Sequence, residues 1–175
     1  MGLRHRIDVA AGRQFADLLL ANARVVSVFA DAIVETSVAI ADGVVVGFGD
    51  YRARRRIDLR GGYLSAGLID SHLHIESTML SPAEFARAVV PHGTTAVVAD
   101  PHEIANVIGE VGVRWMIDAS RGLPLDVNIV LPSCVPESPF VTSGARLGAR
   151  ELRKLAKLPR VVGIGEVMNF PGVIA

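Results

Sequence analysis

The chain has 175 residues, of which 50% are hydrophobic and 21% are charged, so it can bury a core and does not have the composition of a disordered protein. Its 18 basic and 18 acidic side chains cancel, which argues against a large charged surface for nucleic acid or an acidic membrane. No apolar run reaches the roughly 18 residues that a membrane-spanning helix requires. The single cysteine, Cys134, fits a reducing compartment. We therefore expect a cytoplasmic protein.

The first part of the chain has the sequence pattern of a small β domain. Residues 3–16 are expected to form a short amphipathic helix or an ordered leader, and β-branched runs separated by turn residues follow up to about residue 66. Asp42-Gly43 lies between two of these runs and is typical of a two-residue β-hairpin, because Gly readily adopts the positive φ of such a turn. We predict a leader and a small antiparallel β domain over residues 1–66.

From Gly67 onward, short strands alternate with helices. The four predicted strands are "GLIDSHLHI", "TTAVVAD", "DVNIVLPS" and "RVVGIGEV". Helices are predicted after Ser81-Pro82, across roughly 103–120, and in "GARELRKLAKL". This alternation implies parallel β/α units and an α/β fold. Four strands cannot close an eight-stranded barrel, which typically needs about 250 residues. The pattern therefore leaves open an α/β sheet or the first half of a barrel.

Two histidines stand one residue apart at the end of the first of these strands. Because side chains alternate faces along a strand, Asp70, His72 and His74 are expected on one face, with the two histidines about 7 Å apart at Cα. That spacing allows both imidazoles to share one metal ion. Parallel α/β folds place their sites at this end of the strands. The alternative is that both are core histidines whose ring nitrogens have backbone hydrogen-bond partners. The pair alone does not distinguish this alternative from metal binding.

Further candidate residues follow the other strands. Glu166, at the end of the fourth strand, is predicted to point towards the same site as the histidines, at the carboxyl ends of the strands. The alternative is an acid that is only solvated or that caps the next segment. Asp100, His102 and Glu103 follow the second strand and could bind metal or substrate. For Glu103 the competing explanation is an acid favoured by the helix dipole. Cys134 follows the third strand and is predicted to line a pocket rather than to act as a nucleophile.

The strings "GLIDSHLHIESTM", "DPHEIANV", "LPSCVPESPF" and "GEVMNFPGV", spread over residues 67–174, resemble the adenine deaminases of the amidohydrolase superfamily. The resemblance implies a metal-dependent (β/α)₈ barrel, of which residues 67–175 form the first four β/α units, preceded by a small β domain. It also implies hydrolysis of adenine to hypoxanthine and ammonia in purine salvage. The expected cofactor is a binuclear divalent metal centre of Mn²⁺ or Fe²⁺, with Zn²⁺ as an alternative.

The same resemblance implies roles for individual residues. His72 and His74 correspond to metal ligands, and Glu166 corresponds to the acid that bridges the two metals. Glu166 is also placed among the catalytic residues. Asp100, His102 and Glu103 are the remaining catalytic candidates, as contacts to substrate or to the ligands.

Superfamily members usually take two more histidines and a general acid/base aspartate from later strands. We therefore expect this chain to be an N-terminal fragment that turns over poorly or not at all by itself. The expected partner is the small molecule adenine, with no nucleic acid and no membrane, and a homodimer stays open. One alternative is another cyclic amidohydrolase, such as a dihydroorotase or hydantoinase, but those commonly carry a bridging lysine instead of Glu166. The other alternative is a non-catalytic remnant.

Overall fold

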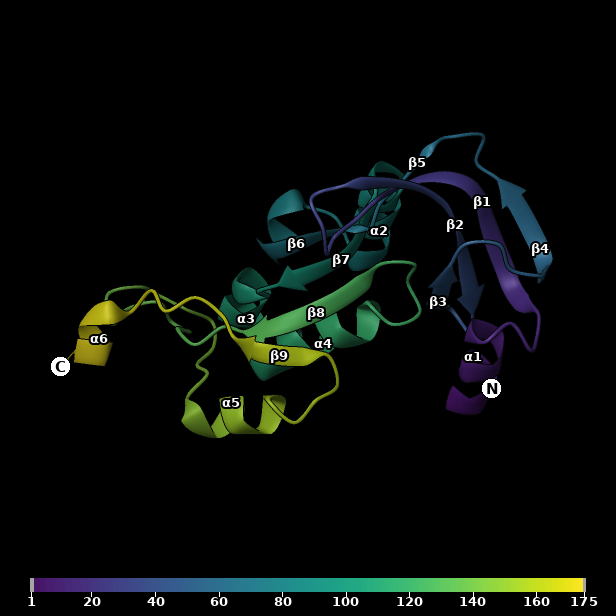
Figure 1. Ribbon diagram of the computed structural model, residues 1–175. Coiled ribbons are helices and arrows are strands. Elements are labelled where there is room, and N and C mark those ends of the chain that lie inside the picture. Colours follow the sequence, from purple (N-terminus) through teal and green to yellow (C-terminus); the bar gives the residue numbers. More distant parts are fainter. Residues whose placement is uncertain (1, 175) are drawn as a thin grey trace. The chain divides into compact units, whose positions relative to one another are not determined.

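The structure is a computed structural model that describes residues 2–174. The chain divides into two compact units, Met1–Ala66 and Gly67–Ala175 (Figure 1). Each unit has its own buried hydrophobic cluster. None of the helices in the described part of the chain combines the length and the apolar character that crossing a bilayer requires.

The first unit is a helix followed by a small sheet. Its elements are α1 (Leu3–Ala10), β1 (Ala16–Val26), β2 (Ile33–Ala41), β3 (Val44–Phe48), β4 (Ala53–Asp58) and β5 (Tyr63–Leu64). Strands β1, β2 and β3 are antiparallel neighbours. The predicted hairpin is present, with φ of 51° at Asp42 and 72° at Gly43. Strands β4 and β5 both run parallel to β1, so the sheet as a whole is mixed.

Small side chains dominate the core of the first unit. Its fully buried members are Val9, Ala16, Leu19, Ala21, Ala39 and Ala41. Val9 is the buried residue of α1. The alanines of β1 and β2 leave room for the helix to approach the sheet, which explains how a helix of only eight residues is held in place.

The second unit is a parallel sheet with helical connections. The strands are β6 (Leu68–Leu73), β7 (Thr94–Ala99), β8 (Asp126–Leu131) and β9 (Val161–Ile164), and they lie in that order. The helices are η1 (Glu76–Thr78), α2 (Pro82–Val89), η2 (Val90–His92), α3 (His102–Ile108), α4 (Glu110–Ala119), α5 (Ala149–Leu155) and α6 (Phe170–Ile174). The α/β class and the four parallel strands are as predicted. The order fits the start of a (β/α)₈ barrel.

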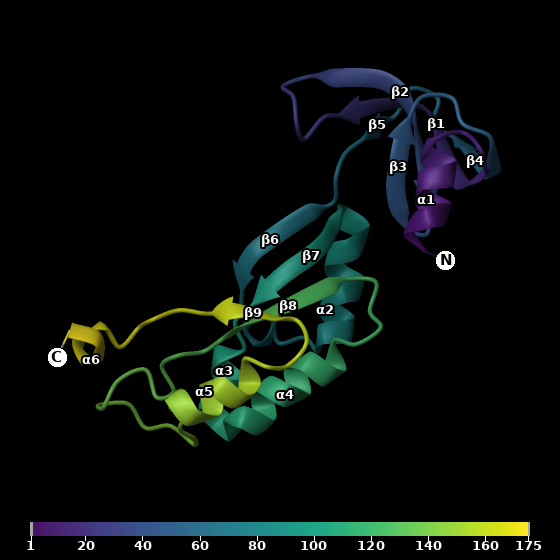
Figure 2. The same cartoon turned by 60° about the horizontal axis from the view of Figure 1, so that its bottom comes forward.

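Helices cover one face of this sheet, as Figures 1 and 2 show for α2, α3, α4 and α5. Alternate strand residues turn towards these helices and form the core, namely Val97, Ala99, Val127, Ile129 and Leu131. The residues between them, such as Val98 and Val130, are only half-buried. The carboxyl ends of the four strands meet at one edge of the sheet, which is where the candidate residues stand.

The segment predicted as one helix over roughly 103–120 is two helices, so that prediction is wrong. Gly109 interrupts it with φ of 62° and ψ of −137°. These angles lie outside the helical region and are accessible mainly to glycine. A Cβ at position 109 would also lie 3.0 Å from the Cβ of Ala145. The break therefore lets the loop before α5 approach the junction between α3 and α4.

Arg160 joins three parts of the second unit just before β9. Its guanidinium donates hydrogen bonds to the carbonyls of Ser120 (3.0 Å), Val127 (3.4 Å) and Ile117. The last carbonyls of a helix have no partner within the helix. Arg160 therefore completes the C-terminal end of α4 and links it to β8.

Candidate metal centre

His72 and His74 lie on either side of the end of β6. The strand ends at Leu73, so the predicted alternation of Asp70, His72 and His74 along one strand face stops before His74. The side chain of Asp70 stays beside its own strand, where its Oδ1 accepts a hydrogen bond from the backbone N–H of His72, two residues later (3.2 Å). The two imidazole centroids are 5.2 Å apart, and their planes are almost perpendicular. Ile75, which is fully buried, anchors the segment that carries His74.

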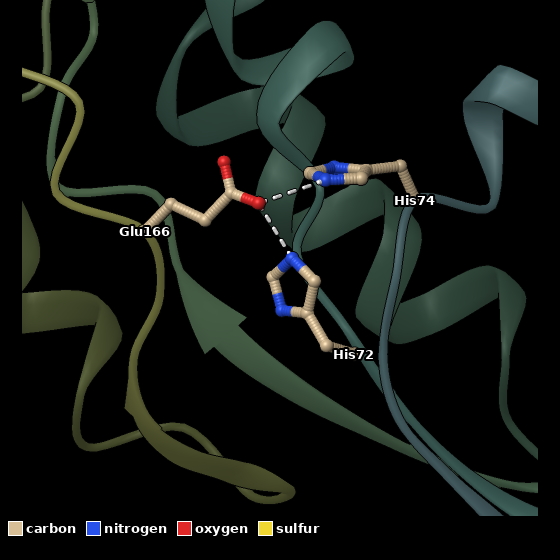
Figure 3. A group of neighbouring side chains, drawn as sticks. All are labelled: His72, His74 and Glu166. Atoms are coloured by element: carbon tan, nitrogen blue, oxygen red, sulfur yellow. Dashed lines mark hydrogen bonds and ion pairs between the residues drawn. The ribbon is translucent and has the colours of Figure 1, made fainter.

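Glu166 follows β9, the outer strand on the opposite side of the sheet from β6, and reaches both histidines from there. Strand β9 ends at Ile164, two residues before Glu166. Its Oε1 lies 2.6 Å from His72 Nε2 and 3.4 Å from His74 Nε2, and Figure 3 shows the carboxylate facing the two rings. One ligand atom from each of the three residues lies within 4.8 Å of the others. The hydrogen bond from His72 holds the pKa of Glu166 below its usual value.

Asp100 contacts both sides of this cluster from the end of β7. Its carbonyl accepts a hydrogen bond from His74 Nδ1 (2.9 Å), and its Oδ2 accepts one from the backbone N–H of Glu166 (3.1 Å). When Nδ1 of His74 donates, Nε2 keeps the lone pair that a metal ion would use. The side chain of Asp100 is fully buried, and this burial raises its pKa. Asp100 therefore fixes the orientation of His74 and the backbone of Glu166.

Glu103 and His102, at the start of α3, have different surroundings. Glu103 Oε2 lies 3.3 Å from His74 Nδ1, and its other oxygen accepts a hydrogen bond from Ser77 Oγ. Burial acts to lower the pKa of His74, but Glu103, the Asp100 carbonyl and Glu166 outweigh it, so the net shift is upward. His102 is 7% exposed, and neither ring nitrogen has a hydrogen-bond partner among the described residues. The structure thus brings Glu103 to the cluster, whereas the ring of His102 forms no hydrogen bond with it.

The loop after β8 makes contacts that the sequence pattern did not reveal. Ser133 Oγ (2.8 Å) and Cys134 Sγ (3.2 Å) both donate to the carbonyl oxygen of Glu166. The backbone N–H of Met168 donates to Cys134 Sγ (3.2 Å). The buried Cys134 thus holds the backbone that carries Glu166, whereas its lining of a pocket stays a prediction. The available sequence signal was the position of "SC" directly after a parallel strand.

Glu76 is a further acid that the sequence pattern did not single out. Its Oε1 accepts a hydrogen bond from the backbone N–H of Ile104 (3.2 Å), which ties the segment after His74 to α3. Its Oε2 is buried and has no hydrogen-bond partner in the described part of the chain, and the burial of the side chain raises the pKa of the carboxyl group.

The donor set of the His72–His74–Glu166 cluster fits a divalent metal ion. Imidazole nitrogen and carboxylate oxygen are ligands that Zn²⁺, Mn²⁺ and Fe²⁺ all accept. The carboxylate faces the Nε2 atoms of both histidines (Figure 3), and one ligand atom from each residue lies within 4.8 Å of the others. Three protein donors leave coordination positions for water or substrate, as in catalytic sites.

Comparison with known proteins identifies the family. Residues 63–173 match the model of the amidohydrolase family. The chain belongs to the amidohydrolase family. The match covers β6 to β9 and thus every residue of the candidate metal centre.

Amidohydrolases of three bacteria illustrate the similarity along the whole chain. The chain is 56% identical over 173 residues to "Adenine deaminase" of Nitratidesulfovibrio vulgaris, and the alignment covers 99% of this chain and 30% of that protein. It is 51% identical over 172 residues to "Adenine deaminase 2" of Desulfotalea psychrophila and 49% identical over 175 residues to "Adenine deaminase" of Halalkalibacterium halodurans. Each of these alignments covers 98% of this chain and 30% of the relative. The chain thus spans about 30% of the length of the curated amidohydrolases it matches.

Asp100→Ala is expected to weaken metal binding at the cluster by about 10- to 100-fold, because residues that orient ligands usually have effects of this size. The substitution removes the acceptor of the Glu166 N–H but keeps the backbone carbonyl that binds His74. The matched control is Asp100→Asn, whose amide oxygen can still accept that hydrogen bond. Competition titration of Mn²⁺ measures the effect, and equal affinities for Asp100→Ala and the unsubstituted chain would contradict the positioning role.

Proposed function

We propose that this chain contributes the first part of the active site of a hydrolytic adenine deaminase. The observation that carries the proposal is the convergence of His72, His74 and Glu166 at the carboxyl ends of parallel strands. The names of the relatives, which match nearly the whole chain at about 50% identity, supply the substrate. The proposed cofactor is a binuclear divalent centre of Mn²⁺ or Fe²⁺, in which His72, His74 and Glu166 are ligands. The proposed setting is purine salvage in the cytoplasm.

The proposed reaction replaces the exocyclic amine of adenine by oxygen from water. The C–N bond to the amine breaks and a C–O bond forms. One proton of the water leaves with the amine as ammonia, and the other remains on a ring nitrogen of hypoxanthine. When bound, the metal supplies hydroxide near neutral pH, because it lowers the pKa of water from about 15.7 toward about 7.

The chain's own residues would orient the site and move protons. Ser133 and Cys134 hold the carbonyl of Glu166 and Asp100 holds its N–H, which keeps the carboxylate directed at the histidines. The side chain of Glu103 is 45% exposed, so it can reach a bound substrate and carry a proton to the leaving nitrogen. The burial of Asp100 and His102 favours supporting roles for these two.

A chimeric enzyme provides the test of the proposed activity. In it, this chain replaces the matching 173-residue stretch of the Nitratidesulfovibrio vulgaris adenine deaminase. With Mn²⁺ added, the chimera is expected to release ammonia from adenine, and its Glu166→Gln variant is expected to lose at least about 100-fold in kcat. We expect the 175-residue chain alone to release little or none.

Two outcomes would contradict the proposal. One is a folded, metal-loaded chimera that does not deaminate adenine. The other is hydrolysis of a dihydropyrimidine or hydantoin in preference to adenine, which would favour another cyclic amidohydrolase. Ammonia release by the purified chain alone would contradict the expectation that it is inactive by itself.

A further inference from the structure

A second group of potential metal ligands lies within the first unit and is separate from the candidate metal centre. His5 projects from α1, Asp17 stands near the start of β1, and Asp42 lies in the turn between β2 and β3. One nitrogen or oxygen atom of each lies within 4.8 Å of the others, and all three residues are half-buried. Three elements that are distant in sequence thus bring an imidazole and two carboxylates together.

Two polar atoms of this His5–Asp17–Asp42 cluster have no hydrogen-bond partner within residues 2–174. His5 Nε2 and Asp42 Oδ2 are both shielded from solvent and unsatisfied. Leaving a buried polar atom without a partner costs about 1–3 kcal/mol. A cation coordinated by both atoms would remove this cost.

The hydrogen bond of His5 leaves one ring nitrogen available to a metal ion. His5 Nδ1 lies 3.0 Å from the side-chain oxygen of Gln14. Because an amide oxygen only accepts hydrogen bonds, Nδ1 is the donor, and in the neutral imidazole Nε2 then has the free lone pair. Histidines that bind metal ions usually donate their other N–H to an oxygen in this way. Asp17 is also fixed, since its Oδ2 accepts a hydrogen bond from the backbone N–H of Asp42 (2.8 Å).

The charge of the cluster also favours a divalent cation. Two carboxylates face one imidazole, and Arg6 is a neighbouring cation, whose Nε lies 3.7 Å from Asp42 Oδ2. This Nε is itself buried, and no residue that the structure describes forms a hydrogen bond with it. Arg6 can balance only one of the two carboxylates, which leaves the other available to a bound cation.

We propose that His5, Asp17 and Asp42 bind a divalent transition-metal ion, with Zn²⁺ as the best match. Zn²⁺ accepts imidazole and carboxylate ligands at about 2.0–2.2 Å, and a water molecule can complete a tetrahedral site. The ion fastens α1 to the sheet. It reinforces contacts that the helix already makes through the buried Val9 and through the hydrogen bond from Tyr51 Oη to the Ala10 carbonyl (3.1 Å). The site is independent of the proposed deaminase activity.

The test uses the untagged 175-residue chain carrying His72→Ala and His74→Ala, which removes the other candidate centre. Calorimetric titration with Zn²⁺ is expected to show one ion per chain, and Zn²⁺ is expected to raise Tm, because a ligand that binds only the folded state stabilises it. Adding His5→Gln or Asp42→Asn is expected to abolish both effects. Asparagine tolerates the positive φ of position 42, so the turn is retained.

Two matched variants and one spectroscopic measurement complete the test. His92→Gln, at an exposed histidine, is expected to leave Zn²⁺ binding unchanged, and Gln14→Ala is expected to weaken it by about 10- to 100-fold. In ¹⁵N NMR of the histidine side chains, Zn²⁺ is expected to shift Nε2 of one histidine while its Nδ1 stays protonated. The absence of Zn²⁺ binding in the double variant, or binding that survives both His5→Gln and Asp42→Asn, would overturn the proposal. An unchanged ¹⁵N spectrum would do the same even if the cluster variants failed to fold.

Discussion

His74→Ala is expected to weaken divalent-metal binding at the candidate metal centre by more than about 100-fold, beyond the usual effect of removing a group that only orients a ligand. His74 offers Nε2 to the cluster while its Nδ1 is held by the Asp100 carbonyl. Without His74, two of the three converging donors remain, His72 and Glu166. Mn²⁺ binding is measured by the decrease of the electron paramagnetic resonance signal of free Mn²⁺.

This experiment is best carried out in the Asp42→Asn background, so that the cluster in the first unit does not contribute. His92→Ala serves as the control, because His92 is exposed and lies outside both clusters. Glu166→Gln is expected to act in the same direction as His74→Ala, since it removes the charged donor. If Mn²⁺ affinity were the same in His74→Ala and His92→Ala, the cluster would not be a metal site.

Gly165→Ala is expected to destabilise the chain by about 1–3 kcal/mol, which is the usual cost of overfilling a packed site. It is also expected to disturb the position of Glu166 and thereby to weaken Mn²⁺ binding. A Cβ at position 165 would collide with Asp100 Oδ2 and would lie 3.2 Å from Val130 Cγ2. The backbone cannot easily move away, because the Gly165 N–H donates to the Leu131 carbonyl (2.8 Å). Asp100 would have to give up its hydrogen bond to Glu166. Urea unfolding and Mn²⁺ titration measure the two effects.

Gly163→Ala provides a matched control two residues earlier in the same chain segment. A Cβ at position 163 would meet Val130 Cγ1 at 3.8 Å, which is an ordinary contact. This variant is expected to change stability and Mn²⁺ affinity much less than Gly165→Ala. Equal effects of the two substitutions would show that loss of glycine flexibility, rather than the collision with Asp100, is responsible.

The parts of the fold that local sequence determines could be predicted. Asp42-Gly43 predicted its hairpin, because positive φ at both positions is a property of those two residues. Ser81-Pro82 predicted the start of α2, where Ser81 Oγ accepts a hydrogen bond from the Glu84 N–H (3.4 Å). In both cases the physical cause lies within a few residues of the feature.

Features that depend on distant residues could not be predicted in this way. The parallel pairing of β4 and β5 with β1 joins segments more than 30 residues apart, and nothing in either strand specifies its direction. The break at Gly109 was missed because a single glycine in a helical pattern is often tolerated. What makes the break necessary is the close approach of Ala145, which follows only from the tertiary structure.

The residues of the candidate site could be predicted from the sequence only in part, as could the fold. The ends of parallel strands meet at one edge, so His72 and Glu166 could be expected near each other. The double role of Asp100 was not accessible, since it depends on a backbone carbonyl pointing one way and a carboxylate pointing another. The contacts of Ser133 and Cys134 with Glu166 belong to the same class.

The bonds of Arg160 have a consequence for the order in which the second unit folds. Arg160 follows Ser120 by 40 positions, yet its guanidinium is what satisfies the final turn of α4. As the chain emerges during synthesis, α4 and β8 can form early, but the carbonyls of Ile117 and Ser120 stay without this partner until residue 160 arrives. The end of α4, strand β8 and the segment just before β9 are thereby coupled into one cooperative step. A loss of Arg160 would appear first as faster amide hydrogen exchange at the end of α4, before any change in the metal centre.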